Sequence, residues 1–213
     1  MNVTFEGNSS TGKNEWLTPP QILIKLGHFD LDPCSPINRP WNTASHHFTI
    51  EDDGLKQQWF GRVFCNPPYD TELITQFIHK CAEHKNALAL TFARTDTKLF
   101  HNEIFKKADS ILFIKGRLKF FHVTGKEGGT AGAPSCLISF NEENSKVLMN
   151  CGIEGKFVRI SRNASLASKA EHGLDFKLRP DVSPILEKDL VQYGRQNTNT
   201  GTGNRNKRKS AKA

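Results

Sequence analysis

The sequence predicts one α/β domain in which a sheet carries helices on both faces. Buried apolar runs typical of strands alternate with amphipathic stretches typical of helices through the middle of the chain. The chain has 213 residues, which is long enough for one sizeable core, and no internal repeat is visible.

Cysteine usage and hydropathy predict an intracellular protein. The five cysteines are scattered singly and most lie inside apolar runs, so we expect reduced core residues and a cytoplasmic location. No apolar run approaches the ~20 residues that a membrane span needs, and the first residues lack the apolar region of a signal peptide. We therefore expect no membrane contact.

The net charge of +7 is concentrated at the carboxyl end. Residues 195–213 contain six basic residues and no acid, so the rest of the chain is nearly neutral. We expect this segment to be a disordered basic tail, which suits non-specific attraction to nucleic acid, although a solubilising terminus explains the charge equally well. With a flexible lead-in at residues 1–13, this leaves residues 14–194 as the folded domain.

The first part of the chain predicts short elements separated by loops. A short helix begins at Pro20 and continues through residues 21–26. Alternating apolar and acidic residues predict a strand that ends at Asp32, and residues 48–50 form a vestigial strand. The apolar run Val63–Cys65 reads as a short buried strand, which two prolines end abruptly.

The middle of the chain gives stronger patterns. Thr71–His84 places apolar residues on one face at spacings of four, which predicts an amphipathic helix. Ala87–Phe92 is a continuous apolar run and predicts a buried strand. A helix is expected at residues 97–107 and a further strand at residues 111–114.

A glycine-rich loop separates two later strands. Residues 116–122 and 135–140 both read as strands, and we expect them to pair as an antiparallel hairpin at one edge of the sheet. The pattern weakens after Asn141, where we expect a strand at residues 156–160 and a helix at residues 185–193.

Asn66, Pro67, Pro68 and Tyr69 form a rigid turn at the carboxyl end of the strand Val63–Cys65, where open α/β sheets place their ligand crevices. The Asn66 side-chain oxygen and the Pro67 carbonyl can both accept from one planar NH2 group, which aims its lone pair at an electrophilic methyl group. Pro68 directs that carbonyl, and Tyr69 can stack on a base drawn out of a duplex. The turn favours methyl transfer to an exocyclic or amide nitrogen, although Asn-Pro also begins ordinary turns.

Asp32 is the centre of a second group of candidate residues. A carboxylate at a strand end can accept from the ammonium or ribose hydroxyls of a cofactor, whereas capping of the next element is the ordinary explanation. No G-x-G-x-x-G or Walker pattern occurs, so a cofactor without phosphates fits better. Asp53, or its neighbours Glu51 and Asp52, can supply a second acidic contact, although a solvated turn explains these acids equally well.

Six motifs occur in a fixed order along the chain. They are Asn14-Glu15-Trp16-Leu17-Thr18-Pro19-Pro20, Leu31-Asp32-Pro33-Cys34-Ser35, Asp53-Gly54-Leu55, Trp59, Asn66-Pro67-Pro68-Tyr69 and Gly116-Arg117-Leu118-Lys119-Phe120. In this order they resemble phage-type Dam methyltransferases, which methylate adenine N6 in DNA with S-adenosylmethionine. The resemblance covers roughly residues 14–140, and the ensemble is far more specific than any single motif.

The resemblance implies a Rossmann-like class I methyltransferase sheet and S-adenosylmethionine as the cofactor. It implies catalytic roles for Asn66, Pro67, Pro68 and Tyr69. It also implies cofactor contacts at Trp16, Thr18, Pro19, Asp32, Pro33 and Cys34, with Asp53 a weaker candidate.

The chain departs from the usual class I pattern in two places. Asp32-Pro33-Cys34-Ser35-Pro36 stands where most class I methyltransferases have a glycine-rich loop. Pro67 follows Cys34 by only 33 positions, so the early strands must be abbreviated. No large separate recognition domain fits, and we expect DNA recognition from the loops at residues 37–58 and 123–134.

Basic residues alternate with apolar ones on the predicted edge strand. Arg117 and Lys119 can meet DNA phosphates there, and Phe120 or Phe121 can contact the flipped base, although a solvated strand face with core phenylalanines explains the pattern equally well. His79, Cys81 and His84 do not share one helix face, so no metal is expected.

The expected function is site-specific adenine-N6 methylation of double-stranded DNA, in a bacterial host cytoplasm if the chain is phage-encoded. GATC is the site that the resemblance implies. Methylation of RNA adenine or of a protein glutamine amide, and a non-catalytic nucleic-acid-binding module, remain alternatives. The sequence does not predict the oligomeric state.

Overall fold

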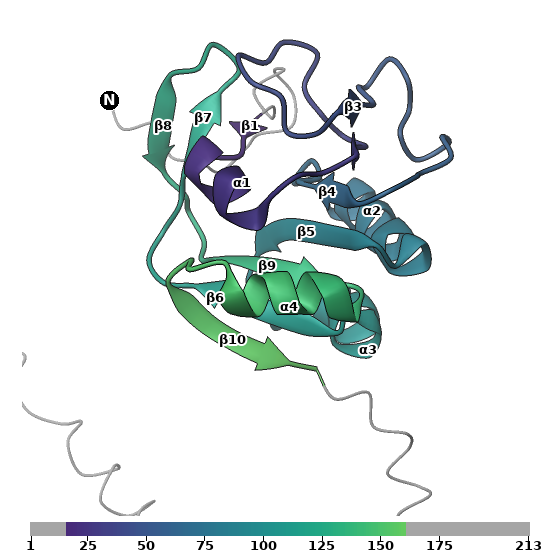
Figure 1. Ribbon diagram of the computed structural model, residues 1–213, viewed down its shortest axis with the longest axis vertical. Helices are drawn as coiled ribbons and strands as arrows, with labels where there is room; N and C mark the ends of the chain where they lie inside the picture. Colours follow the sequence, from purple (N-terminus) through teal and green to yellow (C-terminus); the bar gives the residue numbers. More distant parts are fainter. Residues whose placement is uncertain (1–15, 161–213) are drawn as a thin grey trace, which may run out of the picture. The chain divides into compact units, whose positions relative to one another are not determined.

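The computed structural model describes residues 16–160 (Figure 1). The lead-in predicted at residues 1–13, the helix predicted at 185–193, and the domain end and basic tail predicted beyond 194 lie outside the described residues. In chain order the elements are β1 (Trp16–Leu17), α1 (Pro20–Leu26), β2 (Leu31–Asp32), β3 (His46–His47), β4 (Val63–Cys65), α2 (Thr71–His84), β5 (Ala87–Phe92), the π-helical turn η1 (Phe100–Ile104), α3 (Phe105–Lys107), β6 (Ser110–Ile114), β7 (Lys119–His122), β8 (Glu127–Thr130), β9 (Ser135–Ser139), α4 (Glu142–Asn150) and β10 (Gly155–Arg159).

A seven-stranded mixed sheet forms the centre of the structure, in the order β10-β6-β9-β5-β4-β2-β3 (Figure 1). Strands β3, β2, β4 and β5 run parallel, whereas β9 is antiparallel to both of its neighbours, β5 and β6, and β10 is antiparallel to β6. The predicted mixed α/β fold is confirmed. Because β2, β4 and β5 are parallel, their carboxyl ends meet at one edge of the sheet.

Helices cover both faces of this sheet, as predicted. Successive residues of a strand point to opposite faces. In β4, Val63 and Cys65 belong to a core cluster with Ile78 of α2. Phe64, between them, belongs to a second cluster with Leu26 of α1, to which α4 also contributes. The short strand β4 is therefore buried on both sides, as its uninterrupted apolar run predicted.

The predicted edge hairpin between residues 116–122 and 135–140 is wrong. Strand β7 pairs instead with β8, which forms inside the glycine-rich loop, and with β1, giving a separate three-stranded sheet. Strand β9 is buried at every position and lies inside the main sheet, between β5 and β6. The glycines explain why the loop can form a strand, because a Cβ at Gly128 would lie 2.5 Å from the Trp16 ring of this small sheet.

Three smaller differences concern short elements. The vestigial strand lies at His46–His47 rather than at residues 48–50. The helix predicted at residues 97–107 contains the π-helical turn η1 before it continues as α3. Helix α4 was not predicted, although Asn141 marks its start: the Asn141 side chain accepts from Asn144 N at 2.8 Å.

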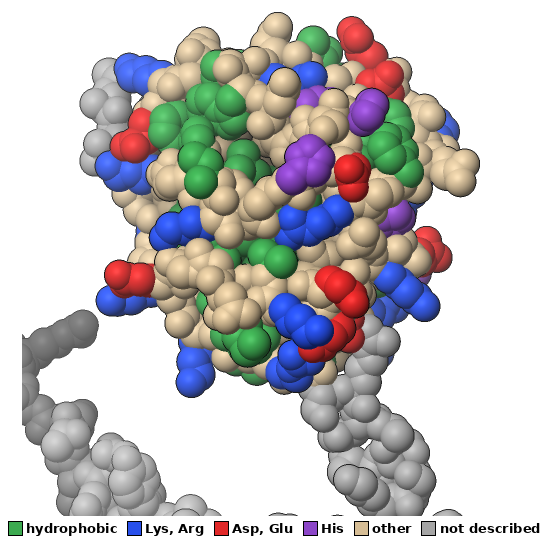
Figure 2. Space-filling model, in the orientation of Figure 1, with side chains coloured by type: hydrophobic (Ala, Val, Ile, Leu, Met, Phe, Trp, Pro, Cys, Tyr) green, Lys and Arg blue, Asp and Glu red, His purple; other side chains and the backbone are tan. Residues whose placement is uncertain are grey.

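One face of the molecule is chemically mixed. On the face shown in Figure 2, Lys and Arg side chains are scattered among acidic, hydrophobic and other polar ones and do not form one block. Within residues 16–160, no helix is long and apolar enough to cross a membrane.

Arg62, just before β4, joins this strand to the elements that cover one face. Its guanidinium donates to the carbonyls of Leu26 at 3.0 Å and His28 at 2.6 Å, and to Asn144 Oδ1 at 2.7 Å. The same group lies 4.3 Å from the centre of the Phe29 ring. One planar cation thus holds the end of α1, the start of β2 and helix α4 in place.

We expect Arg62→Met to lower the free energy of unfolding by about 2–4 kcal/mol, because it leaves three acceptors without their charged donor. The measurement is urea unfolding followed by circular dichroism. Arg159→Met is the matched control, since Arg159 is an exposed arginine that pairs with Glu142 at the surface, and this change should have little effect. Equal losses for the two variants would contradict the structural role of Arg62.

Candidate active site

The carboxyl ends of the parallel strands bring together most of the residues that the sequence singles out. Asp32 ends β2, Asn66 follows β4, and Phe92 ends the neighbouring strand β5. Strand β1 approaches the same edge from the small sheet, since Trp16 contacts Asn66. Residues from three other segments, β1, β2 and β5, therefore lie around the Asn66–Pro67–Pro68–Tyr69 turn.

The Asn66 side chain has a defined orientation. Its Nδ2 donates to the carbonyl oxygen of Trp16 at 3.2 Å. Its Oδ1 is buried and finds no hydrogen-bond partner among the described residues. Because an amide has two donors and an acceptor, the contact with Trp16 leaves a buried acceptor for another molecule.

The turn is also held at its far end. Two prolines follow Asn66, and Pro67 is buried. Asp70 then caps α2, because its side chain accepts from the backbone N–H groups of Glu72 at 3.0 Å and Leu73 at 3.1 Å. The turn is thus fixed between the end of a buried strand and the start of a long helix.

Tyr69 packs against the neighbouring strand. Its ring stacks on that of Phe92, with 4.2 Å between the ring centres and 26° between their planes. The Tyr69 hydroxyl is buried, and this burial raises the pKa of Tyr69 above its usual range. The Tyr69 side chain is therefore neutral, and Phe92 holds its ring in position.

Two further buried polar atoms border the turn. Thr18 Oγ1 and Ser135 Oγ both lack a hydrogen-bond partner within the described residues. Thr18 lies two residues after Trp16, and Ser135 is opposite Phe92 in the β5–β9 pairing. Unpaired buried polar atoms are uncommon and costly, so these two atoms and Asn66 Oδ1 are candidate contacts for a polar ligand. No sequence pattern marks Ser135, because only the insertion of β9 beside β5 places it here.

Asp32 is a buried carboxylate with fixed contacts. It accepts hydrogen bonds from Thr43 Oγ1 and, at 3.1 Å, from the backbone N–H of Cys34. Burial raises the pKa of Asp32 to about 6, and these two hydrogen bonds oppose the rise. His47 holds the same loop, because its Nε2 accepts from the backbone N–H of Thr43 at 3.3 Å.

The turn after Asp32 lies directly against the turn after β4. Cys34 Sγ and Cys65 Sγ are 3.7 Å apart. Burial raises the pKa of Cys34 to about 11 and also raises the pKa of Cys65. Both thiols are therefore neutral, and their contact packs the turn after Asp32 against the end of β4, where the Asn66 turn begins.

The acidic turn at residues 51–55 packs against Pro33. A Cβ at Gly54 would lie 1.9 Å from the carbonyl oxygen of Pro33, so only glycine fits there. Asp53, next to Gly54, has a positive φ of 52° and pairs with Lys56 at 2.8 Å. The Asp52 carboxylate is engaged by the Thr49 backbone N–H at 2.8 Å. Of these two acids, Asp53 is adjacent to the glycine that touches the Asp32 turn.

The residues predicted to contact DNA occupy different surroundings. Phe120 is completely buried in the core, so the expectation that it contacts a flipped base does not fit its position. Lys119 pairs with Glu127 of the neighbouring strand at 2.9 Å. Arg117 is exposed just before β7 and donates to the carbonyl of Ala131 at 3.4 Å.

The loop at residues 37–58, which is predicted to recognise DNA, contacts β7 and also the second predicted loop at residues 123–134. The Trp41 ring meets the Phe121 ring edge to face, with 5.3 Å between their centres. Pro40 lies beside Gly125, where a Cβ would be 3.3 Å from Pro40 Cγ. The loop after β2 and the β7–β8 hairpin thus form one continuous surface near the site.

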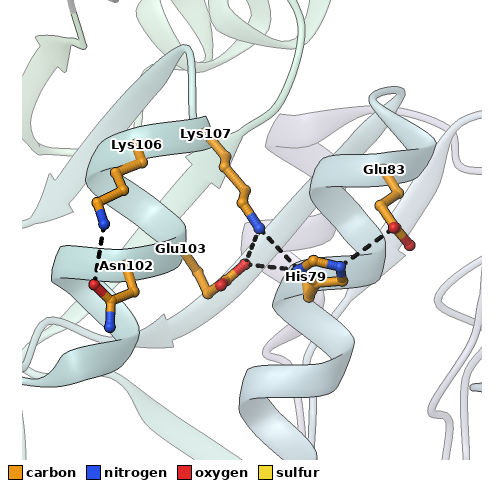
Figure 3. A network of polar contacts seen from close by, with 6 residues as sticks. All are labelled: His79, Glu83, Asn102, Glu103, Lys106 and Lys107. Atoms are coloured by element: carbon orange, nitrogen blue, oxygen red, sulfur yellow. Dashed lines mark hydrogen bonds and ion pairs between the residues drawn. The ribbon is translucent and has the colours of Figure 1, made fainter.

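A shallow hollow of about 350 Å³ lies elsewhere, on the outer side of α2. Glu103, which lines the hollow, already has partners: its carboxylate lies 3.0 Å from His79 Nδ1 and 2.5 Å from Lys107 Nζ (Figure 3). No residue of the Asn66–Tyr69 turn lines this hollow. Among residues 16–160, no group of three or more His, Cys, Asp or Glu side chains could hold a metal ion.

Comparison with protein-family models identifies a match that spans the described residues. The model of the family described as DNA N-6-adenine-methyltransferase (Dam) matches residues 8–163, which include all the candidate site residues named above. No curated protein and no solved structure matches the chain.

The burial of Asp32 predicts a specific dependence of stability on pH. Its pKa is raised from 3.8 to about 6, so the folded state holds this proton more tightly than the unfolded state. The wild-type protein should therefore lose up to about 3 kcal/mol relative to Asp32→Asn as pH rises from about 4 to about 6. Urea unfolding of both proteins across this range measures the difference, with Asp96→Asn as an exposed control. A difference that does not change with pH would contradict the buried state of Asp32.

Proposed function

The chain belongs to the DNA N-6-adenine-methyltransferase (Dam) family, and on this premise we propose that it is a site-specific DNA methyltransferase that uses S-adenosylmethionine and acts on a flipped-out adenine in duplex DNA. Family membership makes it a DNA adenine-N6 methyltransferase in general terms. The cofactor, the sequence specificity and the residue roles below belong to the proposal.

The buried, unpartnered Oδ1 of Asn66 is the observation that carries this mechanism. Adenine N6 is a poor nucleophile, because its lone pair is delocalised into the ring. In the proposal, Asn66 Oδ1 and the Pro67 carbonyl accept the two N6 hydrogens, so the nitrogen becomes tetrahedral and its lone pair localises. The hydrogen bond from Asn66 Nδ2 to Trp16 fixes the acceptor before substrate arrives. Such pre-set acceptors need no reorganisation during the reaction.

Tyr69 holds the adenine ring in this mechanism. Its neutral hydroxyl and its stacking on Phe92 suit an aromatic contact better than proton transfer. Pro68 directs the preceding carbonyl, since its ring restricts the backbone at the turn. Positioning and hydrogen bonding then account for catalysis without a charged base.

The residues around Asp32, together with the β1 segment that contacts Asn66, fit S-adenosylmethionine, which supplies an electrophilic methyl group when bound. The buried Asp32 carboxylate suits ribose hydroxyls or an ammonium group, and the unpaired Thr18 Oγ1 offers a further polar contact. The walls of the proposed cofactor site would be formed by Trp16, Pro19, Pro33 and Cys34, with Asp53 at its rim. The proposed fold is that of a Rossmann-like class I methyltransferase. Its early strands are abbreviated, since β2 and β3 have two residues each.

Asn66→Ala should lower kcat for methyl transfer by at least about 100-fold, because it removes the acceptor that localises the N6 lone pair. Transfer of a labelled methyl group to DNA measures the rate, and calorimetry with S-adenosylmethionine should show nearly unchanged cofactor affinity. Asn150→Ala, on the exposed side of α4, is the matched control. Activity retained by Asn66→Ala would refute the assigned mechanism.

The substrate class is tested by offering DNA, RNA and protein in parallel to the wild-type chain with labelled cofactor. We expect label in adenine of double-stranded DNA, because the matched family acts on DNA. Methylation-sensitive digestion of DNA from expressing cells then identifies the site, for which GATC is the first candidate. Label only in RNA or protein, or no cofactor binding at all, would favour the other functions.

A further inference from the structure

Arg94 lies two residues beyond β5, beside the aromatic pair of the candidate site. Its guanidinium carbon is 5.6 Å from the centre of the Phe92 ring. The same Phe92 ring stacks on Tyr69 at 4.2 Å. A cation therefore lies at the aromatic pair that supports the proposed adenine-stacking residue.

The backbone around Arg94 is fixed, whereas its side chain is exposed. Arg94 N donates to the carbonyl of Phe92 at 2.9 Å, and the Arg94 carbonyl accepts from Thr97 N at 3.1 Å and Thr97 Oγ1 at 2.8 Å. Within residues 16–160, Arg94 forms no ion pair with an acid. Its charge thus differs from that of Lys119, which Glu127 compensates at 2.9 Å.

The order of the strands places Arg94 and Asp32 on opposite sides of Asn66. The three neighbouring strands lie in the spatial order β5-β4-β2. Arg94 follows β5, Asn66 follows the middle strand β4, and Asp32 ends β2. A methyl donor and its acceptor must approach from opposite sides of the transferred group. With the cofactor on the β2 side, the DNA strand reaches Asn66 from the side of Arg94.

We propose that Arg94 binds a phosphate group of the DNA strand that carries the target adenine. A guanidinium presents a planar fork of N–H donors that matches phosphate oxygens. The sugar joins each base to its phosphates, so an adenine placed against Tyr69 brings its own backbone toward the neighbouring Arg94. A phosphate contact of this kind fixes the position of a DNA strand without reading its sequence. This inference rests on the proposed function.

The test compares duplex binding by full-length wild type, Arg94→Ala and Arg94→Lys, measured by fluorescence anisotropy over a series of salt concentrations. We expect Arg94→Ala to weaken binding about tenfold and to reduce the slope of log Kobs against log salt by about one. Arg94→Lys should restore most of the slope, since it keeps the charge. Lys106→Ala is the control. It removes one exposed charge just before the amino end of β6, whereas Arg94 follows the carboxyl end of β5, and it should leave the slope unchanged.

If the slope of log Kobs against log salt is the same for Arg94→Ala as for the wild type, the proposed phosphate contact is wrong. It is also wrong if DNA binding is unchanged while S-adenosylmethionine binding by calorimetry is weaker, because the guanidinium would then serve the cofactor carboxylate. Methyl transfer by the wild type is measured on the same duplex. If the slope changes as expected but no methyl group is transferred, the phosphate contact stands and the assigned reaction fails.

Discussion

The hydrogen bond from Asn66 Nδ2 to the Trp16 carbonyl is the contact on which the candidate site depends. It joins the small β1-β7-β8 sheet to the end of β4 in the main sheet. It also decides which end of the amide is the donor, and so leaves Oδ1 as a buried acceptor. Without this contact the amide could rotate, and its two ends differ in chemistry although they are almost equal in size.

Burial explains why the groups around this amide are mostly neutral. Removal from water raises the pKa of Cys34, Cys65 and Tyr69, so none of them is a nucleophile or a base near neutral pH. Asp32 also has a raised pKa, of about 6, and its two hydrogen bonds limit the rise. A site of this kind suits chemistry that depends on oriented dipoles and aromatic surfaces.

The surroundings of the site come from parts of the chain that contact one another only in the folded state. The loop after β2 meets the β7–β8 hairpin through Trp41 and Phe121. The β5 end contributes Phe92 beneath Tyr69 and Arg94 beside Phe92. The surface offered to a substrate is therefore built from three separate segments around one rigid turn.

The sequence by itself determined the elements with strong local signals. Prolines ended β4 after Cys65, spacings of four defined α2, and continuous apolar residues defined β5, because each of these signals acts within a few residues. The same local reasoning located the Asn66 turn and Asp32 at strand ends.

Only the tertiary structure decided which strands pair. Apolar content shows that a strand is buried but does not identify its neighbours, so β9 was expected at an edge and lies between β5 and β6. That long-range pairing brings Ser135 beside Phe92, and the packing of the small sheet buries Phe120. The unpaired polar atoms at the site likewise depend on contacts between distant segments, which no local pattern encodes.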